Sequence, residues 1–416
     1  MTALTPLERS TLFLIAVLSG LAGAANYQAW PAVPRFALAT LALAGLAWVV
    51  SFATEQLGER FGPGVTGMMQ STLGNLPELF VVIFALQKGE LVVAQTAIVG
   101  SILANALLVL GLVIVVGARR SPDRLMHFSK RLPRDTATLL QVTVFIIVLL
   151  GLSLAAHDPA SHHVKSISII GAICLLVVYG TWVVPYLRTD TAPDVGPAPG
   201  RGDADGSPPA GPASPAAGAA PVAGDEAAED VRPGPRLSLA FTLTLLVIAG
   251  TASAFVSDWF INGLEPAIVK LHISQAFAGL VIVAIAGNAV ENVAGLVLAS
   301  KGRSDLAISV VKNSVAQIAA FLFPLLVLVS FALNTTLTFA LAPIYIGALL
   351  LTTLALAQIT GDGEAAAFEG WALVALYVIL AAFTRASASS PRPADNRRVA
   401  MARSLARAPS RPCAAI

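Results

Sequence analysis

The amino-acid sequence predicts an all-α polytopic membrane protein with about eleven transmembrane helices arranged as two inverted halves. Three observations carry this prediction. The composition is 56% hydrophobic and only 12% charged, eleven apolar stretches are long enough to cross a bilayer, and a polar motif occurs twice within them. A soluble domain is about a quarter charged, so this composition excludes that class. The net charge of +2 indicates no nucleic-acid partner.

A spanning helix needs about 20 mainly apolar residues, and such stretches fall into two sets. They lie near residues 11–29, 35–54, 64–86, 92–117, 136–156 and 166–187, and then near 237–260, 273–299, 304–332, 338–358 and 367–384. The first stretch is followed by others rather than by a cleavage site, so we expect it to be retained. Residues 189–236, between the sets, are rich in Pro, Ala, Gly and Asp and are predicted to form a disordered linker.

The distribution of basic residues predicts the orientation. The loop after the fourth stretch holds six basic residues and two acidic ones, and the positive-inside rule assigns such a loop to the cytoplasm. Alternation then makes the linker cytoplasmic, in a protein expected to lie in a bacterial inner membrane. With eleven spans and a cytoplasmic N-terminus, the Arg-rich tail, residues 386–416, falls on the outer side against the rule.

A repeated motif is the main functional signal. The stretch "GNLPELFVVIFALQKG" from Gly74 recurs as "GNAVENVAGLVLASKG" from Gly287, an offset of 213 residues. Identical residues at this offset are Gly74/Gly287, Asn75/Asn288, Glu78/Glu291, Lys88/Lys301, Gly89/Gly302 and Ser101/Ser314. Five spans separate the two copies, so the second copy is inverted. Inverted repeats with interrupted helices near the midplane are typical of secondary transporters.

The two glutamates predict a cation site. An ionised carboxylate at mid-bilayer costs about 2.5–3.5 kcal/mol, so Glu78 and Glu291 need a proton, a partner or a cation. Gly74, Pro77 and Gly287 are expected to break the two helices and to free carbonyl oxygens for an ion. Ca²⁺ takes six to eight oxygen ligands. The glutamates and the freed carbonyls could provide them, supported by Asn75, Asn288, Ser101 or Ser314. The alternative is a protonated or hydrogen-bonded clamp between helices.

These residues also carry a family resemblance. The segments "GNLPEL…QTAIVGSILANALLVLG" and "EP…GLVIVAIAGNAVEN…SDLAISVVKNSVAQIAAFLFP" resemble the calcium/cation antiporter superfamily, and within it the Ca²⁺/H⁺ exchangers. The resemblance implies one extra helix in residues 1–34, a first five-helix repeat in 35–188 and an inverted second repeat in 237–385. It further implies that Glu78 and Glu291 are alternately protonated and metal-bound. Asn105 and Gln317 on neighbouring helices are implied to assist them.

Departures from the family pattern leave the cation open. The Ca²⁺/H⁺ exchangers usually have His after the second Glu and Gly-Ser in the next helix. This chain has Asn292, and Asn313-Ser314 preceded by Lys312. A Lys312 ammonium beside the site would neutralise one glutamate and favour a monovalent cation. The alternative is a lysine that reaches the cytoplasmic surface or pairs with Asp305.

The expected function is therefore secondary-active cation/proton antiport, with Ca²⁺/H⁺ exchange first, Na⁺/H⁺ exchange as the alternative and a cation channel as the non-transporter competitor. Glu265, which matches the family "EP", and Glu59 are candidate cation entrances, although solvated end charges are the plainer interpretation. No catalytic motif is found, so no enzyme and no resident cofactor are expected. The expected partners are the transported cation, protons and the lipid bilayer; the sequence gives no oligomeric state.

Overall fold

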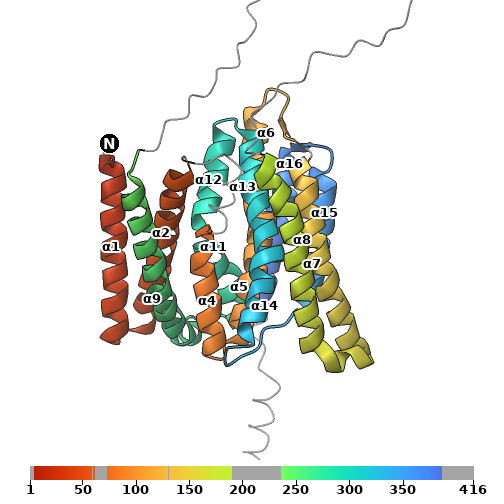
Figure 1. Cartoon of the computed structure of the whole chain (residues 1–416), viewed down its shortest axis with the longest axis horizontal. Helices are drawn as coiled ribbons and strands as arrows, with labels where there is room; N and C mark the ends of the chain where they lie inside the picture. Colours follow the sequence, from red (N-terminus) through yellow and green to blue (C-terminus); the bar gives the residue numbers. More distant parts are fainter. Residues whose placement is uncertain (1–3, 59, 61–72, 130, 190–235, 387–416) are drawn as a thin grey trace, which may run out of the picture.

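The apolar stretches of the sequence form helices that run side by side between two polar ends (Figure 1). The computed structural model describes residues 4–58, 60, 73–129, 131–189 and 236–386. The helices α1, α2 and α9 form one layer, which packs against a larger group built from the other long helices. Helix α4 makes the most extensive contact between α9 and the larger group, which we call the core group.

Most helices of the first half coincide with a predicted stretch. They are α1 (Pro6–Tyr27), α2 (Ala32–Gly58), α4 (Leu76–Gln87), α5 (Leu91–Leu103), the π-helical η1 (Ala104–Val109), α6 (Leu110–Arg120), α7 (Arg131–Ala156), the 3₁₀ turn η2 (Pro159–His163) and α8 (Val164–Thr189). Thr5 begins α1 with a capping box, because its hydroxyl accepts from Glu8 and the Glu8 carboxylate accepts from the Thr5 amide.

The second half follows the same order. Its elements are α9 (Leu239–Leu271), α10 (Gln275–Phe277), the π-helical η3 (Ala278–Val283), α11 (Ala284–Gly287), α12 (Ala289–Ser300), α13 (Ser304–Gln317), the π-helical η4 (Ile318–Leu322), α14 (Phe323–Ser330), α15 (Pro343–Thr360) and α16 (Ala367–Ala386). Elements α10, η3 and α11 form one continuous helical stretch. Another such stretch runs from α13 through η4 to α14.

Nine helical stretches in the described part are long and apolar enough to cross a membrane. A further pair, Gln275–Gly287 with Asn292–Ser300, meets the same criterion as one stretch bent by 56°. Leu76–Gln87 is a shorter apolar helix. Because part of the third predicted stretch lies outside the described residues, the count of eleven stays a prediction. The chain is an integral membrane protein, and its described part is built almost entirely of helices.

The two motif helices have the same backbone geometry. Both α4 and α12 contain 12 residues and follow an Asn that lies outside the helix, Asn75 or Asn288. Both end at a lysine, with φ −88° and ψ 1° at Lys88 and φ −89° and ψ 1° at Lys301. The next residue is in each case a glycine with positive φ, a conformation that favours glycine. The sequence repeat is thus also a structural repeat.

Two π-helical segments are placed alike in the two halves. Segment η1 directly follows α5, which carries Ser101, and η4 directly follows α13, which carries Ser314. A π-helical turn adds a residue to the turn and occurs often at functional sites. These turns lie in the middle of two buried helices, where the sequence predicts continuous α-helix.

The prediction of an all-α fold misses one small feature. Strand β1 (Leu125–His127) pairs antiparallel with β2 (Glu364–Ala366). This pairing joins the loop between α6 and α7 to the loop between α15 and α16. Met126 in the middle of β1 is fully buried and packs against Gly117 of α6. This two-stranded ribbon closes over one end of the core group.

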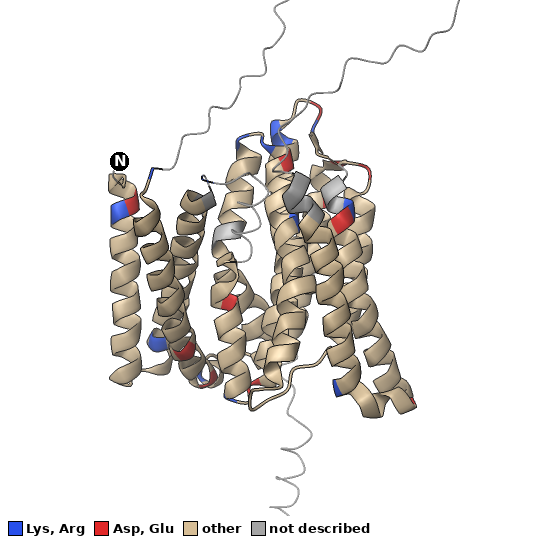
Figure 2. Ribbon diagram, viewed as in Figure 1, with Lys and Arg blue, Asp and Glu red and all other residues tan. Residues whose placement is uncertain are grey.

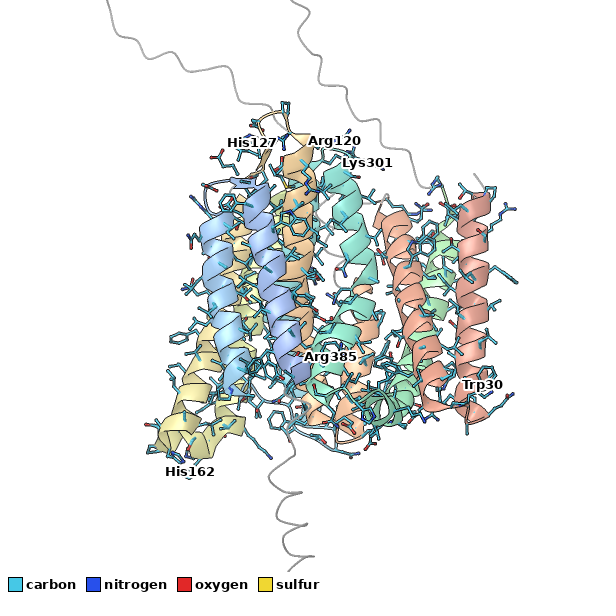
Figure 3. The ribbon with its side chains drawn as sticks, turned by 180° about the vertical axis from the view of Figure 1, so that it is seen from behind. Trp30, Arg120, His127, His162, Lys301 and Arg385 are labelled. Carbon is cyan, nitrogen blue, oxygen red and sulfur yellow. The ribbon has the colours of Figure 1, made fainter. Side chains whose placement is uncertain are left out.

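Charged residues are concentrated at the ends of the helices (Figure 2). Arg120, His127 and Lys301 lie at one end, here called the basic end, and Trp30 and His162 lie at the opposite end (Figure 3). The N-terminus lies at the basic end (Figure 1). Arg385 lies toward the opposite end, as the sequence predicts for a chain that crosses an odd number of times.

Candidate cation site

Glu78 lies in the first turn of α4, within the membrane-spanning part of the bundle, and only 1% of its surface is exposed. Glu78 is the acidic residue of α4. The N-terminus of this helix has no side-chain cap. Its free N–H groups and the positive end of the helix dipole therefore favour a negative charge at this position.

The second motif adjoins the first. Gly287 precedes the break at Asn288, and a Cβ placed on Gly287 would lie 3.8 Å from the Cβ of Glu78. Glu291 occupies the third position of α12, as Glu78 does in α4; its side chain lies outside the described residues. The break of the second motif thus lies beside the first turn of α4.

The breaks occur at Asn75 and Asn288 themselves rather than at the glycines. Asn75 has φ −84° and ψ 3°, and Asn288 has φ −103° and ψ 15°. Pro77 is the second residue of α4. A proline is tolerated there because a backbone N–H in the first turn would have no acceptor within the helix. Pro77 therefore begins the helix after the break. At the second break, the Ala284 carbonyl of α11 accepts from the Asn288 backbone N–H at 3.3 Å and from the Asn288 side-chain amide at 2.9 Å.

Four buried polar side chains link the halves beside this break. The Asn288 amide donates to the Ser101 Oγ at 2.9 Å. The Asn105 amide donates to the Ser314 Oγ at 2.9 Å and to the Asn288 Oδ1 at 3.4 Å. None of the four is more than 2% exposed. We call Ser101, Asn105, Asn288 and Ser314 the polar bridge; it unites four residues that were predicted as ligands.

The polar bridge is less symmetric than the sequence repeat. At the 213-residue offset, Asn105 corresponds to Ile318, whose apolar side chain cannot repeat the hydrogen bond that Asn105 donates to Ser314. Asn75 is buried, with 4% of its surface exposed. Gln317 lies outside the polar bridge, beside the Tyr179 hydroxyl of α8. Asn105 is therefore part of the polar bridge, whereas Gln317 is not.

The candidate selectivity residues occupy different environments. Asn292 lies one turn after Asn288, whose carbonyl accepts from the Asn292 amide at 3.0 Å. Among the described residues, the side-chain oxygens of Asn292 and Asn313 are buried and have no hydrogen-bond partner. Asn313 and Gln317 are four residues apart on α13 and share a face of the helix.

Lys312 is fully buried, with no exposed surface. Its ammonium donates to the Thr360 Oγ1 of α15 at 2.8 Å. The Asp305 carboxylate instead accepts from the Ser129 amide at 2.6 Å. The prediction of a lysine that reaches the surface or pairs with Asp305 is therefore wrong. Packing of α13 against its neighbours carries this side chain inward instead.

Of the two candidate cation entrances, the structure describes Glu265. Glu265 is exposed on α9 near the opposite end. Burial of Glu90 raises the pKa of Glu90 above its usual range, and the negative charge of Glu265 raises it further. Glu90 also accepts from Gln275 at 2.7 Å. Glu59 lies outside the described residues. An acidic pair, Glu90 and Glu265, thus borders the opposite end of α9.

Sequence reasoning missed the glycines that bring α5 against η3. A Cβ on Gly100 would lie 2.6 Å from the backbone of Leu280, and one on Gly279 would overlap the Thr96 side chain. This close approach places Ser101 beside the second motif. Small residues in apolar spans are the signal that could have identified this contact.

The site contains the ligand types that a hard cation prefers. No three His, Cys, Asp or Glu side chains converge anywhere in the described part of the chain. A cation here would therefore be held by carboxylate, amide, hydroxyl and main-chain oxygens together, which suits Ca²⁺ or Na⁺ better than a transition metal.

Known proteins are similar to this chain in sequence. The sodium/calcium exchanger protein family matches residues 32–186 and 241–385. The Ca(2+)/H(+) antiporter of Synechocystis is 30% identical over 382 residues, which cover 90% of this chain and 96% of that protein. The vacuolar calcium ion transporter of Schizosaccharomyces pombe is 30% identical over 373 residues, 89% of this chain and 82% of that protein.

A solved structure gives the same fold. The crystal structure of the Ca2+/H+ antiporter YfkE matches with a TM-score of 0.69 at 24% identity, over 91% of this chain and 99% of that one. The family match covers both halves and omits the first residues, the linker and the tail. The chain therefore belongs to the sodium/calcium exchanger protein family, within the calcium/cation antiporter superfamily.

Proposed function

We propose that this protein is a secondary-active antiporter that exports cytosolic Ca²⁺ in exchange for protons. Glu78 and Glu291 would be alternately protonated and metal-bound. The carrying observation is the buried Glu78 carboxylate beside the break of the second motif, with the polar bridge next to it. Two carboxylates match the charge of one divalent cation and can exchange it for protons.

The position of Lys312 supports a divalent rather than a monovalent cation. A lysine that neutralised one glutamate would leave a site with a single negative charge. The Lys312 ammonium donates instead to Thr360 of α15, a helix that carries neither motif. The names of two relatives, a Ca(2+)/H(+) antiporter and a vacuolar calcium ion transporter, support the same choice.

The cycle would use alternating access. With the site open to the basic end, Ca²⁺ displaces protons from the two glutamates. The layer of α1, α2 and α9 then moves relative to the core group and exposes the site at the opposite end, where protons displace Ca²⁺. The positive-inside rule assigns the basic end and the linker to the cytoplasm of a bacterial inner membrane.

Transport in inside-out vesicles tests this function. A pH dye in the lumen reports cation-induced proton efflux for Ca²⁺, Mn²⁺, Na⁺ and K⁺ offered separately. We expect Ca²⁺ to produce saturable efflux that Glu78→Gln and Glu291→Gln each abolish. Asp305→Asn, which changes an exposed acid at the basic end, is the matched control and should keep exchange.

The other outcomes identify the alternatives. Efflux driven by Na⁺ but not by Ca²⁺ would indicate a sodium/proton antiporter of the same fold. Cation conductance without proton movement would indicate a channel. Full efflux in both glutamine variants would show that the glutamates are not the site.

A further inference from the structure

Lys88 makes an ionic contact that ties the two helix groups together at the opposite end. It is the C-cap of α4 in the core group. Its ammonium lies 2.5 Å from the Asp258 Oδ1, 2.6 Å from the Asn262 Oδ1 and 3.3 Å from the Asp258 carbonyl oxygen, all on α9. One ammonium thus has three oxygen acceptors on the facing helix.

The acceptors are held in place by other contacts. The Asn262 amide donates to the second Asp258 oxygen at 3.1 Å, which fixes the two side chains one helical turn apart. Arg35 of α2 donates to the Asn262 carbonyl at 3.3 Å, which joins α2 to the same point of α9. The Lys88 contact therefore connects α4 to the whole layer of α1, α2 and α9.

The repeat provides an internal comparison. Lys301 has the same place at the end of α12 and the same backbone conformation as Lys88. It lies at the basic end and is exposed (Figure 3). Among the described residues it forms no ion pair, whereas Lys88 forms one with Asp258. The two equivalent lysines thus differ. Lys88 joins the core group to the layer of α1, α2 and α9, and Lys301 forms no such ion pair among the described residues.

We propose that Lys88 is a positioning residue of the transport cycle, whose contact with Asp258 and Asn262 holds α9 against α4 and keeps the opposite end closed. This inference rests on the proposed antiport by alternating access. The three acceptors must release the ammonium before α9 can move along α4. Because Lys88 and Asp258 are 32% and 36% exposed, water can replace the lost bonds and the contact can break reversibly.

Thiol accessibility tests the proposal directly. Ser257 on α9 is fully buried, and its hydroxyl donates to the Pro77 carbonyl of α4 at 3.4 Å. Ser257→Cys, in a chain whose two cysteines are replaced by Ser, places a thiol in the α4–α9 interface. A charged, membrane-impermeant thiol reagent is applied from the opposite end, and its reaction rate reports opening there.

We expect Lys88→Met to raise this rate by about fivefold, the lower end of usual coupling between conformational states. Asp258→Asn should do the same, and Lys88→Arg should restore the slow rate. Lys301→Met is the matched control in the other repeat and should leave the rate unchanged. Equal rates in Lys88→Met and its parent would overturn the proposal.

Cross-linking provides a second test. Cysteines at 88 and 258, joined by a short bis-methanethiosulfonate, should stop cation-driven proton exchange until a reductant cleaves the link. Exchange that continued in cross-linked protein would also overturn the proposal. The accessibility result is independent of the ion: if Ca²⁺ drove no exchange while the rates changed as expected, the proposed function would fail and the role of Lys88 would stand.

Discussion

At the scale of single residues, Glu78 shows what a buried carboxylate in a membrane requires. An ionised carboxylate at mid-bilayer costs about 2.5–3.5 kcal/mol. The dipole at a helix N-terminus returns at most about 2 kcal/mol in partly buried sites. Glu78 has this favourable position in the first turn of α4, yet the dipole does not offset the whole cost. A proton, a partner within the protein or a cation must offset the rest. In the proposed exchange, the proton and the cation alternate in this role.

Lys312 leads to a prediction about stability rather than selectivity. Its ammonium is fully buried, and among the described residues its acceptor is the neutral Thr360 hydroxyl. Met is similar in length and carries no charge. Lys312→Met should therefore increase the free energy of unfolding by about 2 kcal/mol and raise the thermal unfolding midpoint in detergent by several degrees. The preference for Ca²⁺ over Na⁺ should stay the same.

Thr360→Val is the matched control for Lys312→Met. It leaves the buried ammonium without that acceptor, which costs about 1–3 kcal/mol, and should lower the same midpoint. A Lys312→Met protein that changed its preference between Ca²⁺ and Na⁺ would contradict this prediction and would make Lys312 part of the cation site.

At the scale of elements, the contact between α5 and η3 depends on glycine. A Cβ at position 100 would lie 2.6 Å from the Leu280 Cα and carbonyl oxygen, and backbone atoms cannot move aside as a flexible side chain can. Gly100→Ala should therefore destabilise the protein by about 1–3 kcal/mol. It should also weaken Ca²⁺-driven exchange, because Ser101 is the next residue. Thermal unfolding and vesicle transport measure the two effects.

Gly180→Ala is the control for Gly100→Ala. Gly180 also lies inside a helix, α8, but a Cβ there would meet no atom within 4 Å. The substitution should stabilise the helix slightly, by about 0.5–1 kcal/mol. If both variants unfolded at the same temperature, close packing of α5 on η3 would not be the reason that position 100 is glycine.

The ribbon of β1 and β2 carries a pH-dependent contact. The His127 Nε2 lies 2.6 Å from the Asp123 Oδ2, and its Nδ1 lies 3.6 Å from the Glu364 carboxylate on the facing strand. The hydrogen bond to Asp123 raises the pKa of His127 and lowers the pKa of Asp123. Both groups are charged at pH values between the lowered pKa of Asp123 and the raised pKa of His127, so the ion pair is strongest in that pH range.

The direction of the pH effect follows from these shifts. The histidine contribution is complete below its ordinary pKa of about 6.5 and is lost as the pH rises through the raised value. The aspartate contribution is lost as the pH falls through the lowered value. An NMR titration should find the raised His127 pKa, and Asp123→Asn should remove most of the shift. Glu364→Gln should remove only a small part; the reverse order would contradict the assignment.

At the scale of the whole molecule, the sequence predicted the features that repeat along the chain. The apolar stretches predicted the helices, and the 213-residue offset predicted that the two motifs have the same backbone form. Features that depend on packing were not predicted. The ribbon joins two three-residue strands too short for a periodic signal, and the bond from Asn105 to Ser314 crosses between the halves.

The π-helical turns place Asn105 and Gln317, the two residues implied to assist the glutamates, at different points of their helices. Asn105 lies inside η1, whereas Gln317 is the last residue of α13, just before η4. Their separation of 212 residues differs by one from the 213-residue offset of the repeat. A π-helical turn changes the direction of a side chain without any change in apolar pattern. No count of hydrophobic residues could have distinguished the two positions.

Packing between the halves predicts that the connection between them can be cut. The most extensive helix contacts include α2 with α9, α6 with α16 and α5 with η3, each of which joins one half to the other. A chain divided between Gly206 and Ser207, within the predicted linker, should therefore reassemble when both fragments are made in one cell. Co-purification and Ca²⁺-driven proton efflux in vesicles would measure assembly and function.

Neither fragment alone should transport, because each carries one glutamate and half of the polar bridge. A first fragment with Gly100→Ala should assemble less well, since it weakens the contact of α5 with η3. Fragments that co-purify fully but do not transport would show that the cycle needs the linker itself.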